Sequence, residues 1–191
     1  MLFVRKTSIY HQTIGIYLSN SLSQGLYNKC NEYFILSRDN VIIKKILVAV
    51  DGSKTSLDAA EHAICHAEKN NSELTALYVV SSDARYGYLE DDQKVGLTAP
   101  LKEIVMMAVE KGEKLLDEVK QKASKTDIDV KTEVIIGYTS VAKSIVEYAE
   151  ERNIDLIVIG TRGMTGIKKM LLGSTASGVV TYAHCPVLIV K

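Results

Sequence analysis

The chain of 191 residues has no tryptophan, only two prolines and three cysteines, and its net charge is zero. Three cysteines at no short spacing are typical neither of a disulfide framework nor of a zinc site, which uses pairs such as C-x-x-C. Because 23 basic residues balance 23 acidic ones, no net field attracts nucleic acid or an acidic membrane surface. We therefore expect no nucleic-acid partner and no membrane partner.

Long apolar runs are also missing. The sequence contains no run of about 18 apolar residues, so no transmembrane helix is expected. Near the N-terminus the charged residues Arg5 and Lys6 follow the first apolar residues instead of preceding them, which is the reverse of the order in a signal peptide. Together these absences predict a cytoplasmic protein.

The composition of the chain changes near residue 41. Residues 1–40 are rich in serine and asparagine, carry few charges and show no helical or strand periodicity of any length. We therefore expect an N-terminal extension at 1–40 and one folded domain at 41–191. Two explanations of the extension stay open: a flexible or partner-binding arm, and upstream sequence that is not natively translated.

From residue 41 onward, apolar strands alternate with amphipathic helices. Strands are expected at residues 41–50, 74–80, 130–136, 155–159 and 187–190, helices are expected to end near residues 70, 122, 153 and 182, and a long loop is expected at 81–99. Such alternation indicates a parallel sheet with right-handed crossovers. The predicted fold is α/β, a doubly wound five-stranded parallel sheet in a Rossmann-like sandwich. Ligands of such sheets bind beyond the carboxyl ends of the strands.

The segment that follows the fourth expected strand has the clearest chemistry. It places glycines at 160, 163 and 173, and then Ser174 and Thr175 at the start of a helix. Glycine lets backbone amides approach an anion closely, and the free amides and dipole of a helix N-terminus favour phosphate. Gly160, Gly163, Gly173, Ser174 and Thr175 therefore predict a phosphate-binding cradle.

Two common phosphate motifs do not fit this sequence. Residues 160–166 read G-x-x-G-x-x-G, which differs from the dinucleotide fingerprint G-x-G-x-x-G. A serine separates Gly52 from Lys54, and Leu47 stands where a P-loop has its first glycine. Classical kinase or GTPase machinery is therefore not expected.

Three segments resemble the universal stress protein (UspA-like) family. Residues 44–53, KKILVAVDGS, look like the opening of that family, and residues 183–190 look like its last helix exit and strand. The spacing G-x2-G-x9-G-S at residues 160–174 matches the nucleotide motif of the ATP-binding branch. The resemblance spans residues 44–191 and implies a sandwich of the adenine nucleotide alpha hydrolase-like type.

The resemblance also implies a ligand, ATP with Mg²⁺ or Mn²⁺. Asp51 falls on the family's aspartate beside the ribose and the phosphate-bound metal, and Val79 falls where the backbone meets the adenine edge. Arg162 has two open interpretations: its charge helps a phosphate, or it faces water. The nucleotide-binding residues implied in this way are Asp51, Val79, Gly160, Arg162, Gly163, Gly173, Ser174 and Thr175.

The function implied by the resemblance is that of a nucleotide-dependent regulatory protein of the stress response. No histidine or carboxylate pair near residues 160–175 would orient a water molecule, so we expect at most weak ATP hydrolysis or autophosphorylation. Two alternatives stay open. One is a ligand-free interaction module in which the glycines only form tight turns. The other is a slow ATP-hydrolysing or nucleotidyl-transfer enzyme, although such enzymes carry a serine- and glycine-rich loop where this chain has residues 51–53.

The last expected strand, residues 187–190, is apolar on both faces and contains no charge or proline. We expect it at an edge of the sheet, where such a strand promotes association. The resemblance implies an isologous homodimer through this strand. The alternative is that the N-terminal arm or the long loop covers the strand within a monomer.

Overall fold

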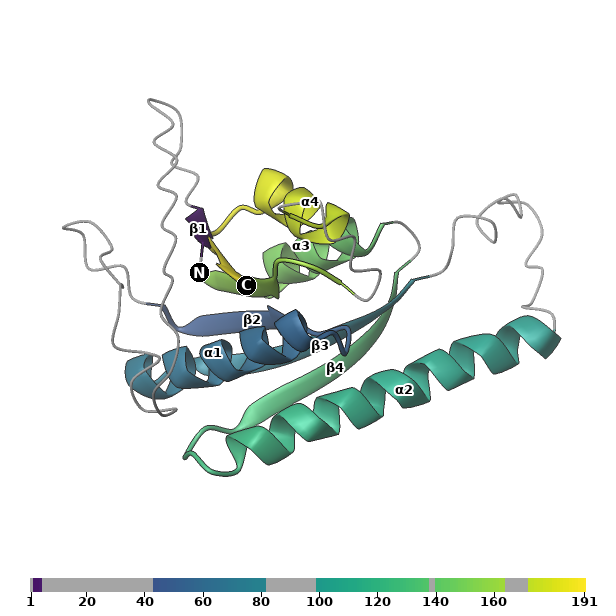
Figure 1. Ribbon diagram of the computed structural model, residues 1–191, viewed down its shortest axis with the longest axis horizontal. Coiled ribbons are helices and arrows are strands. Elements are labelled where there is room, and N and C mark those ends of the chain that lie inside the picture. Colours follow the sequence, from purple (N-terminus) through teal and green to yellow (C-terminus); the bar gives the residue numbers. More distant parts are fainter. Residues whose placement is uncertain (1, 5–42, 82–98, 138–139, 164–171) are drawn as a thin grey trace.

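Strands and helices alternate along the chain from residue 45 onward (Figure 1). The computed structural model describes residues 2–4, 43–81, 99–137, 140–163 and 172–191. Its strands are β1 (Leu2–Val4), β2 (Lys45–Ala49), β3 (Glu73–Ser81), β4 (Val130–Gly137), β5 (Leu156–Gly160) and β6 (Val187–Val190). Its helices are α1 (Lys54–Asn70), α2 (Ala99–Ala123), α3 (Val141–Glu151) and α4 (Ser174–Tyr182). The expected loop at 81–99 lies largely outside the described residues.

Five parallel strands form the body of the sheet in the order β6-β5-β2-β3-β4. This parallel part begins in the middle, at β2, continues outward through β3 and β4, and then returns to the other side of β2 at β5. This order confirms the predicted doubly wound five-stranded parallel sheet. The point where the order reverses lies between β2 and β5, and this is the place where such sheets bind ligands.

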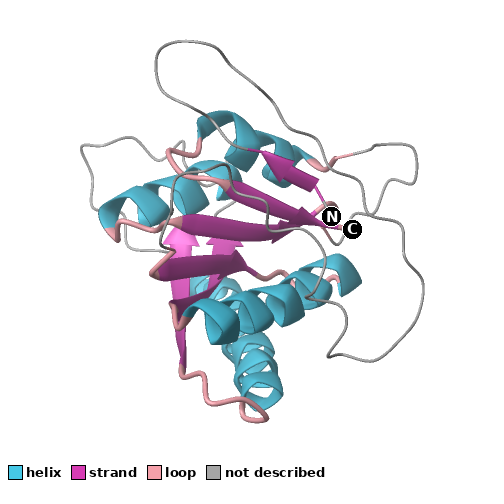
Figure 2. Ribbon diagram, turned by 90° about the vertical axis from the view of Figure 1, so that its left-hand side faces the viewer, coloured by secondary structure: helices cyan, strands magenta, loops and turns pink. Residues whose placement is uncertain are grey.

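The two faces of the sheet are covered by different helices, as Figures 1 and 2 show. On β2, Ile46 and Val48 pack in one core with residues of α1 and α2. Leu47 and Ala49 alternate with them and pack in a second core with residues of α3 and α4. Because both faces are buried, the central strands have no polar face, which explains the continuous apolar runs in the sequence.

The N-terminus adds a sixth strand that the sequence did not predict. Leu2–Val4, as β1, pairs antiparallel with β6, with Leu2 opposite Ile189 and Val4 opposite Val187. One expectation is therefore wrong: β6 is not the edge of the sheet. The physical reason is that a three-residue strand has too few residues to show a period, and its pairing depends on a distant partner. The alternative in which the N-terminal arm covers the last strand agrees with the structure.

Two of the helices begin with a side-chain cap, and a third begins after a glycine. Ser53 caps α1, and Ser140 caps α3, each by accepting a hydrogen bond from a backbone amide three residues later. α4 begins at Ser174 and has Gly173 as its N-cap. In the described part of the chain, no helix is both long enough and apolar enough to cross a membrane.

Candidate functional site

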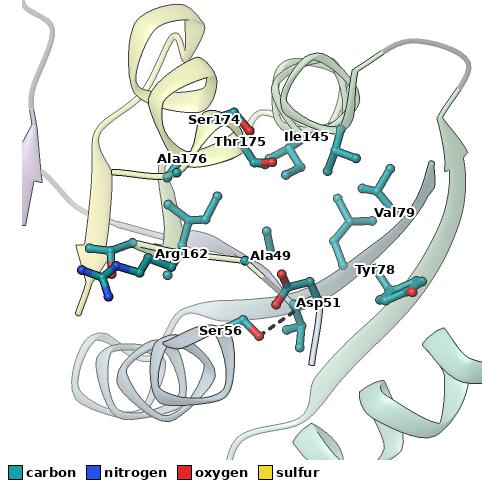
Figure 3. Close-up of a pocket in the computed structure, with 18 of the residues that line it drawn as sticks. Ala49, Asp51, Ser56, Tyr78, Val79, Ile145, Arg162, Ser174, Thr175 and Ala176 are labelled. Atoms are coloured by element: carbon teal, nitrogen blue, oxygen red, sulfur yellow. Dashed lines mark hydrogen bonds between the residues drawn. The ribbon is translucent and has the colours of Figure 1, made fainter. Parts of the chain in front are cut away.

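A cavity of about 250 Å³ opens at the carboxyl ends of the central strands, beside the start of α4 (Figure 3). Aliphatic side chains form its apolar side: Ala49, Leu77, Val79, Val141, Ile145 and Ile159. Its polar side consists of Asp51, the loop at 160–163 and the segment 173–175. One side of the cavity therefore suits a flat apolar group, and the other suits a charged one.

All eight residues that the sequence singled out line this one cavity, namely Asp51, Val79, Gly160, Arg162, Gly163, Gly173, Ser174 and Thr175. They come together because β2, β3 and β5 are parallel neighbours and end at the same side of the sheet. The structure thus shows that these residues line one cavity. Their contact with a nucleotide stays a prediction.

Asp51 follows β2 in a tight turn. Its Oδ1 accepts a hydrogen bond of 2.9 Å from the backbone amide of Ser53. Gly52 has a φ of 86°, a left-handed conformation that favours glycine. On the other side of the carboxylate, a Cβ added to Gly163 would lie 2.8 Å from Asp51 Oδ2. The absence of a side chain at 163 therefore lets the Asp51 carboxylate lie against the loop that follows β5.

The first turn of α4 lies across the cavity from Asp51 (Figure 3). Its N-cap is Gly173, which has no side chain and so makes no capping hydrogen bond. The amide of Gly173 donates to the carbonyl oxygen of Thr161 at 2.8 Å, which ties the helix start to the β5 loop. The amides of the first turn and the hydroxyls of Ser174 and Thr175 are thus grouped at one wall of the cavity. Such a helix start is a site for an anion.

The start of α1 supports the same loop from the other side. The hydroxyl of Thr55 donates to the carbonyl oxygen of Arg162 at 2.6 Å, and that of Ser53 donates to the same oxygen at 3.2 Å. A Cβ added to Gly160 would lie 2.8 Å from the carbonyl carbon and oxygen of Thr55. Gly160 is therefore needed for the contact between β5 and α1, whether or not a ligand is bound.

Arg162 takes part in the site through its backbone. Its carbonyl oxygen is fixed by the α1 hydroxyls, whereas Figure 3 shows its guanidinium directed away from the cavity. Of the two interpretations of Arg162, this placement favours the one in which the charge faces water.

The lining residues that were not predicted as site residues include Tyr78, Lys111 and Thr161. Burial, followed by the charge of Asp51, raises the pKa of Tyr78. Gly112 of α2 lies so close to the Tyr78 ring that an added Cβ would collide with it. Lys111 reaches the cavity from α2, whose register against β3 cannot be derived from a local motif. Thr161 stands inside the G-x2-G spacing, and its neighbourhood to two glycines was a signal that could have identified it.

Comparisons with known proteins identify the family of this chain. Residues 43–191 match the sequence profile of the universal stress protein family. The chain belongs to the universal stress protein family. Universal stress protein MJ0531 of Methanocaldococcus jannaschii is 38% identical over 164 residues, which cover 84% of this chain and 91% of that protein. The solved structure of universal stress protein UspA from Lactobacillus plantarum has a TM-score of 0.69 and 30% identity, covering 80% of this chain and all of that one.

Two other solved universal stress proteins contain adenine nucleotides. One is in complex with cAMP, and it has a TM-score of 0.58 and 24% identity, covering 78% of this chain and 98% of that one. The other, from Archaeoglobus fulgidus, is in complex with dAMP, and it has a TM-score of 0.57 and 20% identity, covering 78% of this chain and 99% of that one. At 24% and 20% identity, the likeness shows that these two proteins have the same fold as this chain.

Proposed function

We propose that this universal stress protein is a regulatory protein that binds ATP in the cavity between β2, β5 and α4. The observation that carries the proposal is the open start of α4, which faces Asp51 across a cavity with an apolar far side. The cAMP and dAMP complexes support it, because they establish that this fold can hold an adenine nucleotide. The cytoplasmic location remains a prediction from the sequence.

The cavity has a suitable place for each part of the nucleotide. The adenine lies on the apolar side, with its edge at the backbone of Val79. The ribose lies between Asp51 and the loop that contains Gly160 and Gly163. The phosphates lie at the start of α4, where backbone amides and two hydroxyls provide donors.

A divalent cation fits this arrangement with few protein ligands. Asp51 supplies one carboxylate at the polar side of the cavity, and the phosphate oxygens supply the other ligands that Mg²⁺ or Mn²⁺ prefers. When bound, the cation would neutralise phosphate charge. Asp51 would hold it on the side opposite α4.

The proposed role is regulation and not fast catalysis. Asp51 is the only carboxylate that lines the described cavity. Ser174 and Thr175 provide hydroxyls near the phosphates, so slow autophosphorylation there is compatible with the site. The slow hydrolase or nucleotidyl-transfer enzyme remains the second candidate, and the ligand-free module is the third.

Mass spectrometry of gently purified protein separates these candidates. Co-purified ATP is the expected result; AMP or ADP would favour a hydrolase, and an absence of ligand would favour the interaction module. Calorimetry with ATP should then show that a chelator and Asp51→Ala each weaken binding. If neither does, the proposed metal and the role of Asp51 are wrong. Asp58→Ala, on the body of α1, is the matched control.

We further propose that residues 41–191 can form a homodimer through β6 when β1 leaves it. In the structure β1 covers the outer edge of β6, with Phe3 opposite Leu188. A second copy therefore competes with the N-terminal extension for the same backbone groups. Light scattering should show dimers for a chain that starts at Lys44. A monomer at all concentrations tested would refute the dimer.

The full chain provides the control. It should be less dimeric than the shortened chain, and Phe3→Pro should restore dimers because proline removes a backbone donor from β1. Equal dimer content in all three proteins would mean that the extension does not compete for this edge.

A further inference from the structure

The two halves of α2 differ in what they contact. From residue 112 onward, each turn of the helix has a residue buried against the sheet, namely Gly112, Leu116, Val119 and Ala123. Before Gly112, none of the α2 residues whose burial the structure describes is buried. Figure 1 shows this end of the helix projecting beyond the strands. Residues 99–111 are therefore the projecting half of α2, outside the core that the rest of the helix helps to form.

The projecting half of α2 is nevertheless apolar. Positions 104–109 read IVMMAV, without a polar residue. Met106 and Met107 have exposed fractions of 62% and 69%, and they lie about 100° apart around the helix because it has about 3.6 residues per turn. A helix that is apolar over so wide an arc is ordinarily buried, and the flexible methionine side chain adapts readily to a binding partner. The projecting half of α2 is thus suited to hold a partner.

The charges on either side of Met107 indicate which partner fits. Glu103 precedes Met107 by four residues, Lys111 follows it by four, and all three residues are exposed. Residues four apart lie on the same face of a helix, so these three form a stripe with a negative end, an apolar centre and a positive end. If a two-fold axis passes through Met107, the stripe meets its own copy with opposite charges facing each other. The stripe is therefore complementary to itself.

We propose that the projecting half of α2 binds the same half of a second copy of this chain, antiparallel and with Met107 at the two-fold axis. Met107 then packs on its counterpart, and Glu103 of each copy pairs with Lys111 of the other. Such a contact uses the same surface on both copies and closes as a dimer. It leaves β6 free, because α2 packs on β3 and β4, at the other end of the strand order.

Two properties of this dimer follow from its geometry. A contact between two half-helices buries less than the roughly 1,200–2,000 Å² of a stable complex, so we expect a weak dimer with a Kd of roughly 0.1–1 mM. Lys111 also lines the cavity, so Glu103 of the second copy comes to the edge of the candidate ligand site. The dimer itself does not depend on the proposed nucleotide.

Sedimentation equilibrium of the full chain at concentrations up to about 1 mM tests the dimer. Met107→Glu places two carboxylates at the axis and should weaken association about 100-fold or more, which leaves a monomer. Tyr182→Glu is the matched control, because Tyr182 is also 69% exposed but lies on α4; this variant should associate as the wild type does. A wild-type chain that stays monomeric, or a dimer content that Met107→Glu leaves unchanged, overturns the proposal.

An exchange of charges tests the antiparallel arrangement. Glu103→Lys and Lys111→Glu each bring like charges together at both ends of the contact, so each should weaken association about 10-fold. The double variant restores opposite charges and should return to within about threefold of the wild-type affinity. The two positions lie about 12 Å apart along the helix, so recovery has to come from contact between copies. A double variant as weak as the single ones overturns the proposed pairing.

Discussion

Two helices begin at the same cavity, and they begin in different ways. The start of α1 is capped by a side chain, because Ser53 Oγ accepts a hydrogen bond from the backbone amide of Ser56. The start of α4 follows Gly173, which offers no such acceptor. An end that is capped by its own sequence stabilises the fold, whereas an end without a cap keeps its amides for a ligand. The comparison gives α1 a structural role and makes α4 the helix of the proposed binding site.

The variant with the largest expected effect is Gly173→Val. Its side chain should keep phosphate away from at least two amides, which corresponds to a loss of roughly 1,000-fold in ATP affinity. The fold should remain, because the φ of Gly173 is −70°, which other residues adopt as well. Its added Cβ would lie 3.3 Å from the carbonyl oxygen of Thr161, a tight contact that requires the loop after β5 to shift slightly. Calorimetry and circular dichroism measure the two effects. Wild-type affinity in this variant would contradict the assignment of α4.

The structural role of α1 can be tested through pH. Burial, with smaller contributions from His62 and Lys69, lowers the pKa of His66 from 6.5 to about 4. Folded His66 thus stays neutral while unfolded His66 binds a proton, so stability is complete above pH 6.5 and falls as the pH falls toward 4. The loss is about 3 kcal/mol from this group.

Urea unfolding between pH 7 and pH 4 measures this loss. His66→Gln should remove about that amount of the pH dependence, and the exposed His184→Gln is the matched control. An unchanged pH profile in His66→Gln would show that the burial of His66 does not carry a protonation penalty.

A smaller effect is expected at the contact between α1 and β5. Gly160→Ala brings a Cβ to 2.8 Å from backbone atoms of Thr55, so α1 has to shift, at a cost of about 1–3 kcal/mol. Gly163→Ala is the matched control, because its Cβ meets only the Asp51 side chain, which can rotate. Urea unfolding should therefore show a larger loss for Gly160→Ala. Equal stabilities of the Gly160→Ala and Gly163→Ala variants would mean that α1 does not restrict the side chain at position 160.

The smallest expected effect separates the two helix starts directly. Ser53→Ala removes the cap of α1 and should cost about 1 kcal/mol of stability. Ser174→Ala removes no capping bond and should leave stability unchanged while it lowers ATP affinity. Thermal unfolding and calorimetry of both variants provide the comparison. A pattern with the two effects exchanged would reverse the roles of α1 and α4.

Much of the fold was predictable because its signals are local. The central strands β2 and β5 are runs of apolar residues that end at turns, and Asp51 and Gly160 mark these two ends. Their meeting in one cavity follows from the doubly wound order. By contrast, β1 depends on a partner at the far end of the sequence, and Lys111 depends on how α2 lies across the sheet. Contacts of this kind have no local pattern.

The bond between the amide of Thr161 and the carbonyl oxygen of Val190 has a consequence for communication within the molecule. It joins the loop after β5, which lines the cavity, to β6. Only β5 lies between the point where the strand order reverses and β6, the strand that β1 covers. Because neighbouring strands lie about 5 Å apart, the cavity and the edge of β6 that pairs with β1 are close together. If bound ATP changes the equilibrium for replacing β1 by a second copy at β6, linkage requires that this replacement change the ATP affinity by the same factor.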